Sequence, residues 1–269
     1  MHETTGGRTR RAAPLRRRHM NGCRMTDGSP CSVGGSKSEG QTGRACQDFQ
    51  KMFEEAIQVI TLMVEMRDCH TAGHQQRVSQ LAGAIAEGLQ MSNDRVWRIR
   101  MAGLLHDIGK IVVPIEILGK PGRLNEIESA IVRTHPRVGY EMLIQIDFAA
   151  PIADAVLQHH ERMDGSGYPA GLGGDQILPE ARILGVADVV EAMCSHRPYR
   201  PALGVDRALM EIEAQRGILY DNDVVDACLT LFRGRGFTFQ AQPGTIRPQT
   251  EERVLVSAKS CSLARTAAR

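Results

Sequence analysis

Hydrophobic residues recur every three or four positions through the middle of the chain, from about residue 46 to residue 237. The segment 46–68 places five apolar side chains on one helical face, namely Phe49, Phe53, Ile57, Ile60 and Val64. The segment 74–90 repeats this pattern with Val78, Leu81, Ile85 and Leu89. The spacing predicts amphipathic helices, and no convincing strand pattern is present.

Capping and helix-breaking residues predict where several helices begin and end. Ser92 or Asn93 can cap a helix that runs through Trp97 and Leu105, and Asn125 can cap another that stops before the His-Pro pair at 135–136. Later helices are predicted at 150–159, 180–195, 205–215 and 222–233, with loops at 117–124 and 165–174. The predicted fold class is therefore all-α, with one domain at 46–237 and disordered tails at 1–45 and 238–269.

Length and charge narrow the class of protein. The chain has 269 residues, 42% of them hydrophobic, which is enough for one sizeable core. Its formal net charge is only +2, but six of the twelve residues at 8–19 are arginine. Such an arm could contact nucleic acid or anionic lipid. A disordered extension is the commoner outcome, so no stable nucleic-acid partner is predicted.

Apolar runs and cysteines bear on location. No signal peptide and no run as long as a membrane span is visible. The seven cysteines form no C-x-x-C pair, which favours reduced thiols over disulfides or a thiolate zinc site. We therefore predict a cytoplasmic protein.

Histidines are the most informative residues. Seven of the nine fall between His70 and His196, and several stand where a predicted helix begins or ends, so their side chains can converge. Together with Asp107 and Asp188 they offer only nitrogen and oxygen donors, which suit Mn, Fe or Zn. The adjacent His159 and His160 could serve one ion only if the helix ends there, because neighbouring side chains on a helix diverge by about 100°.

Six motifs, taken together, resemble the HD-GYP branch of the HD phosphohydrolases. They are "HTAGHQQRV", "LLHDIGKIVVP", "THPRVGYEML", "HHERMDGSGYPAGL", "EARILGVADVVEAM" and "RPYR". The resemblance covers roughly residues 50–233. It implies an HD-domain helical bundle that hydrolyses the bacterial second messenger cyclic di-GMP to pGpG, GMP or both. Two alternatives stay open: hydrolysis of 3′,3′-cyclic GMP-AMP, and weak catalysis combined with docking of diguanylate cyclases (GGDEF proteins) through the GYP loop.

The resemblance also implies a ligand set for two divalent ions, with Fe or Mn favoured and Zn or others open. The first ion would be held by His74, His106, Asp107 and Asp188, and the second by Asp107, His135, His159 and His160. Asp107 would bridge ions about 3.5–4 Å apart, which would share the attacking hydroxide. Gly165 and Gly167 would let the chain leave its helix after the paired histidines. His70 stands where some relatives have a glutamate for a third ion, so it is either a third-ion ligand or an exposed histidine.

Other residues are expected to contact the substrate or to support the ligands. Lys110, which with Asp107 forms the predicted catalytic pair, could hold a phosphate oxygen, and Arg197 and Arg200 could bind phosphate or guanine. The expected supporting residues are Asp164, bonded to a metal-bound histidine; Tyr168, at the lip of a loop stiffened by Gly167 and Pro169; and Glu191. No receiver, sensory or membrane domain is visible, so input is expected from partners, tails, metal supply or substrate level.

Overall fold

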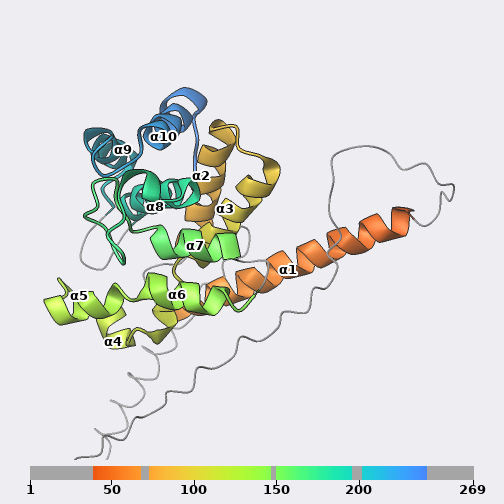
Figure 1. Cartoon of the computed structure of the whole chain (residues 1–269), viewed down its shortest axis with the longest axis horizontal. Helices are drawn as coiled ribbons and strands as arrows, with labels where there is room; N and C mark the ends of the chain where they lie inside the picture. The colour runs from red at the N-terminus through yellow and green to blue at the C-terminus, as the bar shows by residue number, and fades with distance from the viewer. Residues whose placement is uncertain (1–38, 68–72, 147–149, 196–201, 241–269) are drawn as a thin grey trace, which may run out of the picture. The chain divides into compact units, whose positions relative to one another are not determined.

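Helices make up the regular structure of the part of the chain described by the computed structural model, which covers residues 39–67, 73–146, 150–195 and 202–240. Two isolated bridges are the only β-type pairing within these residues, as the all-α prediction requires (Figure 1). The chain divides into two units, 1–47 and 48–269, and the core packing and the site described below lie in the second. His70, Arg197 and Arg200 lie outside the described residues.

The helices follow one another with short connections. They are α1 Glu39–Arg67, α2 His74–Gly88, α3 Asn93–Leu105, α4 Ile115–Leu118, α5 Glu126–Val132, α6 His135–Leu143, α7 Ala150–Gln158, α8 Pro179–Cys194, α9 Val205–Ala214 and α10 Asn222–Arg235, with 3-10 turns η1 Ile108–Val112 and η3 Gly174–Gln176. Ser92 caps α3, and Asn125 forms a capping box with Glu128 at the start of α5. None of the described helices combines the length and apolar character needed to cross a bilayer.

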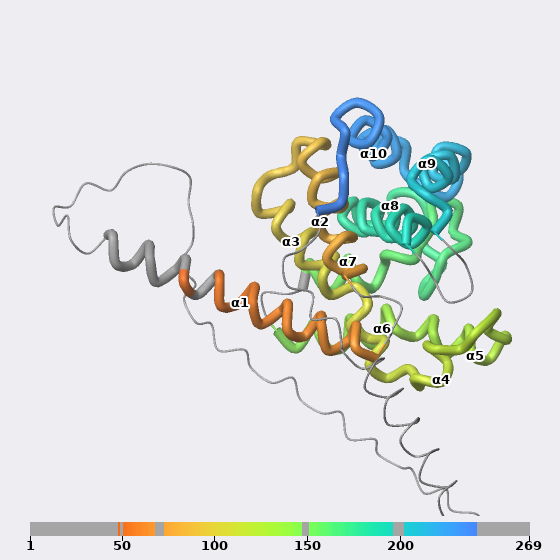
Figure 2. The backbone as a smooth tube through the Cα atoms, turned by 180° about the vertical axis from the view of Figure 1, so that it is seen from behind, coloured from red at the N-terminus to blue at the C-terminus, as the bar shows by residue number. Residues whose placement is uncertain are grey.

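The core lies where α2 and α8 meet α3 and α7. Val78, Leu81 and Ile85, predicted on one face of α2, are completely buried there. In both views α9 and α10 pack on one side of α8, whereas α4, α5 and α6 lie towards the opposite side of the domain (Figures 1 and 2). Helix α7 contacts α6 on one side and α3 and α8 on the other, so it links the two parts.

Four short elements were not predicted, namely α4, α6, η1 and η3, and two of them, α6 and η1, flank later site residues. Helix α6 begins at His135, where the sequence indicated only an ending. The reason is that Pro136 lies in the first turn, which needs no amide donor. Turn η1 and helix α4 were also missed, and α4 includes Ile117 and Leu118 of the segment predicted as a loop.

The predicted boundaries and one predicted buried position need correction. Helix α1 begins at Glu39, inside the predicted tail 1–45. At the other end, Phe239 packs on the core, so contacts with the core continue beyond the predicted limit at residue 237. Ile60 is 41% exposed, whereas Thr61 is buried because its hydroxyl donates to the Leu104 carbonyl at 3.1 Å.

Close backbone contact between η1 and α6 depends on a glycine. A Cβ atom added to Gly109 would lie 2.0 Å from the carbonyl oxygen of His135 and 2.7 Å from the amide nitrogen of Gly139. Backbone atoms cannot move aside as a flexible side chain can. Glycine therefore allows η1 to approach α6 closely enough to place Asp107 beside His135.

We expect Gly109→Ala to lower the free energy of unfolding by about 1–3 kcal/mol, because overpacking would separate η1 from α6. Urea denaturation followed by circular dichroism measures the effect. Gly234→Ala in α10 is the matched control, since the nearest atom to its added Cβ is 3.8 Å away. The control should be neutral or more stable by about 0.5–1 kcal/mol. Equal midpoints for the two variants would contradict this account of the η1–α6 contact.

Candidate metal centre

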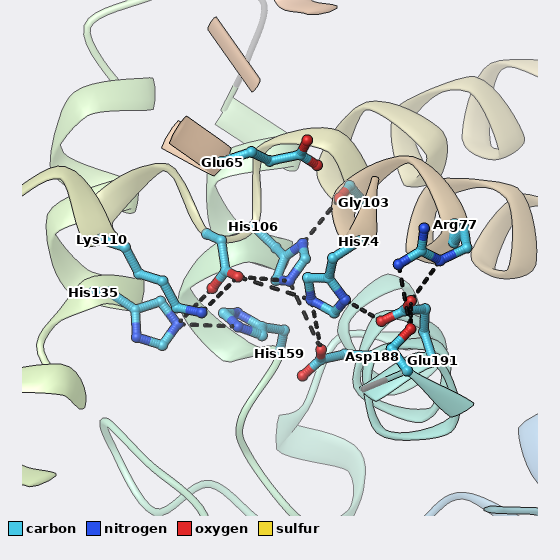
Figure 3. Close-up of polar contacts among 12 residues, drawn as sticks. Glu65, His74, Arg77, Gly103, His106, Lys110, His135, His159, Asp188 and Glu191 are labelled. Atoms are coloured by element: carbon cyan, nitrogen blue, oxygen red, sulfur yellow. Dashed lines mark hydrogen bonds and ion pairs between the residues drawn. The ribbon is translucent and has the colours of Figure 1, made fainter. Parts of the chain in front are cut away.

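Seven side chains that begin, end or line five helices converge on one buried space. His74 begins α2, His106 and Asp107 follow α3, and His135 begins α6. The remaining three are His159 and His160, which follow α7, and Asp188 within α8. Three sets have ligand atoms within 4.8 Å of one another: His135, His159 and His160; His74, His106 and Asp188; and His106, Asp107 and His159. The structure thus brings together all seven residues expected to bind the two ions, and four of their imidazoles face a common space in Figure 3.

Three of the histidines are held in the same way. Each ring is oriented by a hydrogen bond from its Nδ1 to the carbonyl oxygen three residues earlier. That carbonyl is located in the last turn of a helix and has no partner within that helix. The Nδ1 to carbonyl oxygen distances are 2.9 Å for His106 and Gly103, 2.7 Å for His135 and Val132, and 2.6 Å for His159 and Val156. Because Nδ1 must donate to the carbonyl, each Nε2 is left with a lone pair directed into the site.

These lone pairs fit a cation and little else. The Nε2 atoms of His135 and His159 are 3.4 Å apart, so two acceptors face each other. The Nε2 atom of His106 is buried and makes no hydrogen bond within the described part of the chain. Burial and neighbouring rings hold the pKa of His159 well below its usual value, and burial lowers the pKa of His160 to about 3. Neutral imidazoles and carboxylates are the ligands that a divalent ion requires.

Asp107 lies between the two histidine groups. Its Oδ1 is 3.4 Å from His135 Nε2, whereas its Oδ2 is 3.5 Å from His106 Nε2 and 3.8 Å from His74 Nε2. Burial alone would raise the pKa of Asp107, but Lys110 and the surrounding histidines hold it well below its usual range. The Nζ atom of Lys110 is 2.8 Å from Oδ2. An ionised carboxylate with one oxygen towards each group has the arrangement expected of a bridging ligand.

His74 is positioned by carboxylates instead of a helix carbonyl. Its Nδ1 donates to Glu191, and its Nε2 lies 3.2 Å from Asp188 Oδ1. Burial alone would lower the pKa of His74, but hydrogen bonds to Asp188 and Glu191 raise it to about 9. Glu191 is fully buried, and it accepts from Arg77 Nε at 2.6 Å and from the Ser195 hydroxyl at 2.5 Å. Figure 3 shows Glu191 and Arg77 on one side of His74, with Lys110 and His135 towards the other side.

The paired histidines lie at the end of α7, as expected, but the glycines do not end the helix. Helix α7 stops at Gln158, whose carbonyl accepts from the Glu161 amide at 2.8 Å. A Cβ atom on Gly167 would lie 2.4 Å from Glu161 Cα. Gly167 therefore brings the loop back against the helix end. There the Tyr168 ring stacks on His160, with centroids 4.7 Å apart.

Asp164 does not have the position expected of it. It is exposed, and its Oδ1 accepts from the Ser166 amide at 2.9 Å instead of orienting a histidine. The buried acid of this loop is Glu161, which accepts from the amides of Ala170 and Leu172 at 2.7 and 2.9 Å. Sequence reasoning missed both Glu161 and Arg77. A charged residue directly beside the ligand pair was the available signal for Glu161, whereas Arg77 depends on a contact across 114 positions.

Known proteins that resemble this chain include HD-domain phosphodiesterases. The family model for the HD domain matches residues 58–224. The chain is 47% identical over 190 residues to the cyclic di-GMP phosphodiesterase response regulator RpfG of Xanthomonas campestris, covering 70% of this chain and 50% of that protein. It is 41% identical over 152 residues to the 3′3′-cGAMP-specific phosphodiesterase 3 of Vibrio cholerae, covering 56% of this chain and 33% of the relative.

Among solved structures, a cyclic GMP-AMP specific phosphodiesterase of Vibrio cholerae shares the fold, with a TM-score of 0.53 at 18% sequence identity. The match covers 67% of this chain and 48% of that one. The chain thus spans half or less of the length of these relatives.

The raised pKa of His74 generates a prediction about metal binding. Below about pH 9 the imidazole of His74 carries a second ring proton in the ion-free protein. An ion that binds to His74 must displace that proton. The affinity for Mn²⁺ should therefore rise with pH up to about 9 and then level off. Calorimetric titration at pH 7.5 in two buffers of different ionisation enthalpy should show release of about one proton for the ion bound by this group. An affinity independent of pH between 7 and 9 would refute the expectation.

Proposed function

The chain belongs to the HD-domain family, as the resemblance predicted, and on this basis we propose that it is a metal-dependent phosphodiesterase that hydrolyses cyclic di-GMP. One observation carries the proposal. Asp107 lies between two buried imidazole groups, with one carboxylate oxygen facing each group. This arrangement suits two neighbouring cations, which is the kind of site that phosphodiester hydrolysis uses.

Two groups of residues would hold the ions. His74, His106 and Asp188 would form one position, and His135, His159 and His160 the other, with Asp107 shared. Divalent ions there would supply Lewis-acid stabilisation of the phosphate and activation of water. We propose Fe or Mn as the physiological metals, since the donor set is nitrogen and oxygen without thiolate.

The protein's own groups bind and orient the substrate. Lys110 is partly exposed beside Asp107, so its ammonium is placed to contact a phosphate oxygen at the site. The buried imidazoles would exclude bulk water from bound ions on the core side, which would strengthen electrostatic interactions with the phosphate. Arg197 and Arg200 stay proposed substrate contacts. His70 stays either a ligand of a third ion or an exposed histidine.

The substrate proposed first is cyclic di-GMP, because the relative at 47% identity is named for it. The second candidate is 3′,3′-cyclic GMP-AMP, supported by the Vibrio cholerae relative at 41% identity. The products pGpG and GMP, docking of GGDEF proteins through the GYP loop, and a cytoplasmic location stay predictions.

Replacing Asp107 tests the metal scheme. Asp107→Ala removes a ligand from both positions and leaves two cations without a shared anion, so bound metal and turnover should fall together. Turnover of cyclic di-GMP should fall by at least about 100-fold if the ions supply the dominant electrostatic stabilisation. Metal analysis and product chromatography on the same anaerobic sample measure the two quantities.

Asp175→Ala is the matched control, because Asp175 is fully exposed in η3, after the GYP motif, and pairs only with Arg182 among the described residues. Full metal content and activity in Asp107→Ala would overturn the phosphodiesterase proposal. The unaltered protein should hydrolyse cyclic di-GMP faster than 3′,3′-cyclic GMP-AMP. The opposite ranking would select the second candidate.

A further inference from the structure

Three planar side chains in contact with one another connect the surface to the ligand set formed by His135, His159 and His160. The Arg133 guanidinium lies over the Tyr168 ring, with Cζ 5.1 Å from the ring centroid. On its other contact, Tyr168 stacks on His160 at 4.7 Å with an angle of 26° between the planes. Arg133 is itself exposed, two residues before His135 and directly after α5. A positive charge therefore stands beside the candidate metal centre, and no function has been assigned to it.

Several arginines of the domain are held by acidic side chains. Surface examples that form ion pairs with carboxylates are Arg95, Arg98, Arg100, Arg216 and Arg233. Within the described ranges, Arg133 forms no ion pair with a carboxylate, and its guanidinium lies over the face of the Tyr168 ring. A guanidinium stacked on a ring keeps its five N–H donors at the edge of its plane, where they can reach an anion.

The proposed substrate supplies such an anion. A cyclic dinucleotide contains two phosphodiester groups, and only the one being cleaved can lie at the metal centre. The other keeps its negative charge and must be placed elsewhere on the protein. Arginine binds phosphate in a bidentate manner, and a stacked guanidinium loses less side-chain freedom when it does so.

We propose that Arg133, held by Tyr168, forms an anion subsite for the phosphodiester group that is not being cleaved. The inference rests on the proposed function and adds to it a reason for preferring cyclic dinucleotides over simple phosphodiesters. Tyr168 acts here as a positioning residue, because its ring fixes the guanidinium relative to His160. The subsite selects for a second phosphate at a set position.

The test compares Arg133→Ala and Arg133→Lys with Arg137→Ala. Arg137 is exposed on α6, four residues further along, and lies in no ligand or substrate group, so it is the matched control. Two substrates are used with metal-loaded protein: cyclic di-GMP and bis(p-nitrophenyl) phosphate, which has one phosphodiester group. Equilibrium dialysis with a hydrolysis-resistant phosphorothioate analogue of cyclic di-GMP gives the affinity independently of turnover.

Arg133→Ala should weaken analogue binding by about 10-fold to 100-fold, as expected for loss of a charge-assisted contact. The ratio of kcat/KM for cyclic di-GMP to that for bis(p-nitrophenyl) phosphate should fall by a similar factor. Arg133→Lys should recover part of the loss, because it keeps the charge without the planar fork. Arg137→Ala should match the unaltered protein.

Analogue affinity within twofold of the unaltered protein in Arg133→Ala would overturn the subsite. So would an equal loss on both substrates, since that result would place the effect at the metal centre. Failure of the proposed function itself looks different: the unaltered protein, with its metals bound, would hydrolyse neither substrate. The comparison of analogue affinities would still decide the role of Arg133 in that case.

Discussion

Convergence of lone pairs in a buried space is the constraint on which this structure depends. Imidazole Nε2 atoms and carboxylate oxygens repel one another, and burying them without a counter-charge costs several kcal/mol per ionised group. The fold holds them together because their backbones are fixed by helix ends. His106, His135 and His159 use their Nδ1 protons to satisfy carbonyls that a helix terminus leaves without partners. Helix termination and ligand orientation are therefore the same set of hydrogen bonds.

Periodicity predicted the helices that cover the core, because burial imposes a helical spacing on their apolar residues. Helices α2, α3 and α7 to α10 were found in this way, within a few residues of their ends. Pro136 shows where the approach fails. Proline correctly indicated that a helix ends before it, since α5 stops at Val132, but the same residue is favourable in a first turn, and the start of α6 there was missed.

For the site, the ligands could be predicted from the sequence, whereas most of the residues that orient them could not. The motifs that resemble the HD-GYP family indicated its ligands, six of which lie next to helix ends and the seventh, Asp188, within α8, and the structure brings them together. The residues that orient the ligands were not visible in the same way. Arg77 and Glu191 meet across more than a hundred positions, and Glu161 fixes the loop through amides nine and eleven residues later. Asp164 was chosen over Glu161 because sequence alone does not reveal which of two nearby acids is buried.

The position of Asp107 between two ligand groups has a consequence for how the groups would fill. A carboxylate that serves two cations ties their occupancies together, so neither binding constant belongs to one position alone. The first ion would fix the rotamer and charge of a ligand that the second ion also needs, while the two ions repel each other across it. The balance of these effects is a coupling free energy that is the same in either order of binding. The protein would then respond to metal supply as a cooperative unit, with a steeper or shallower threshold than two independent chelators would give.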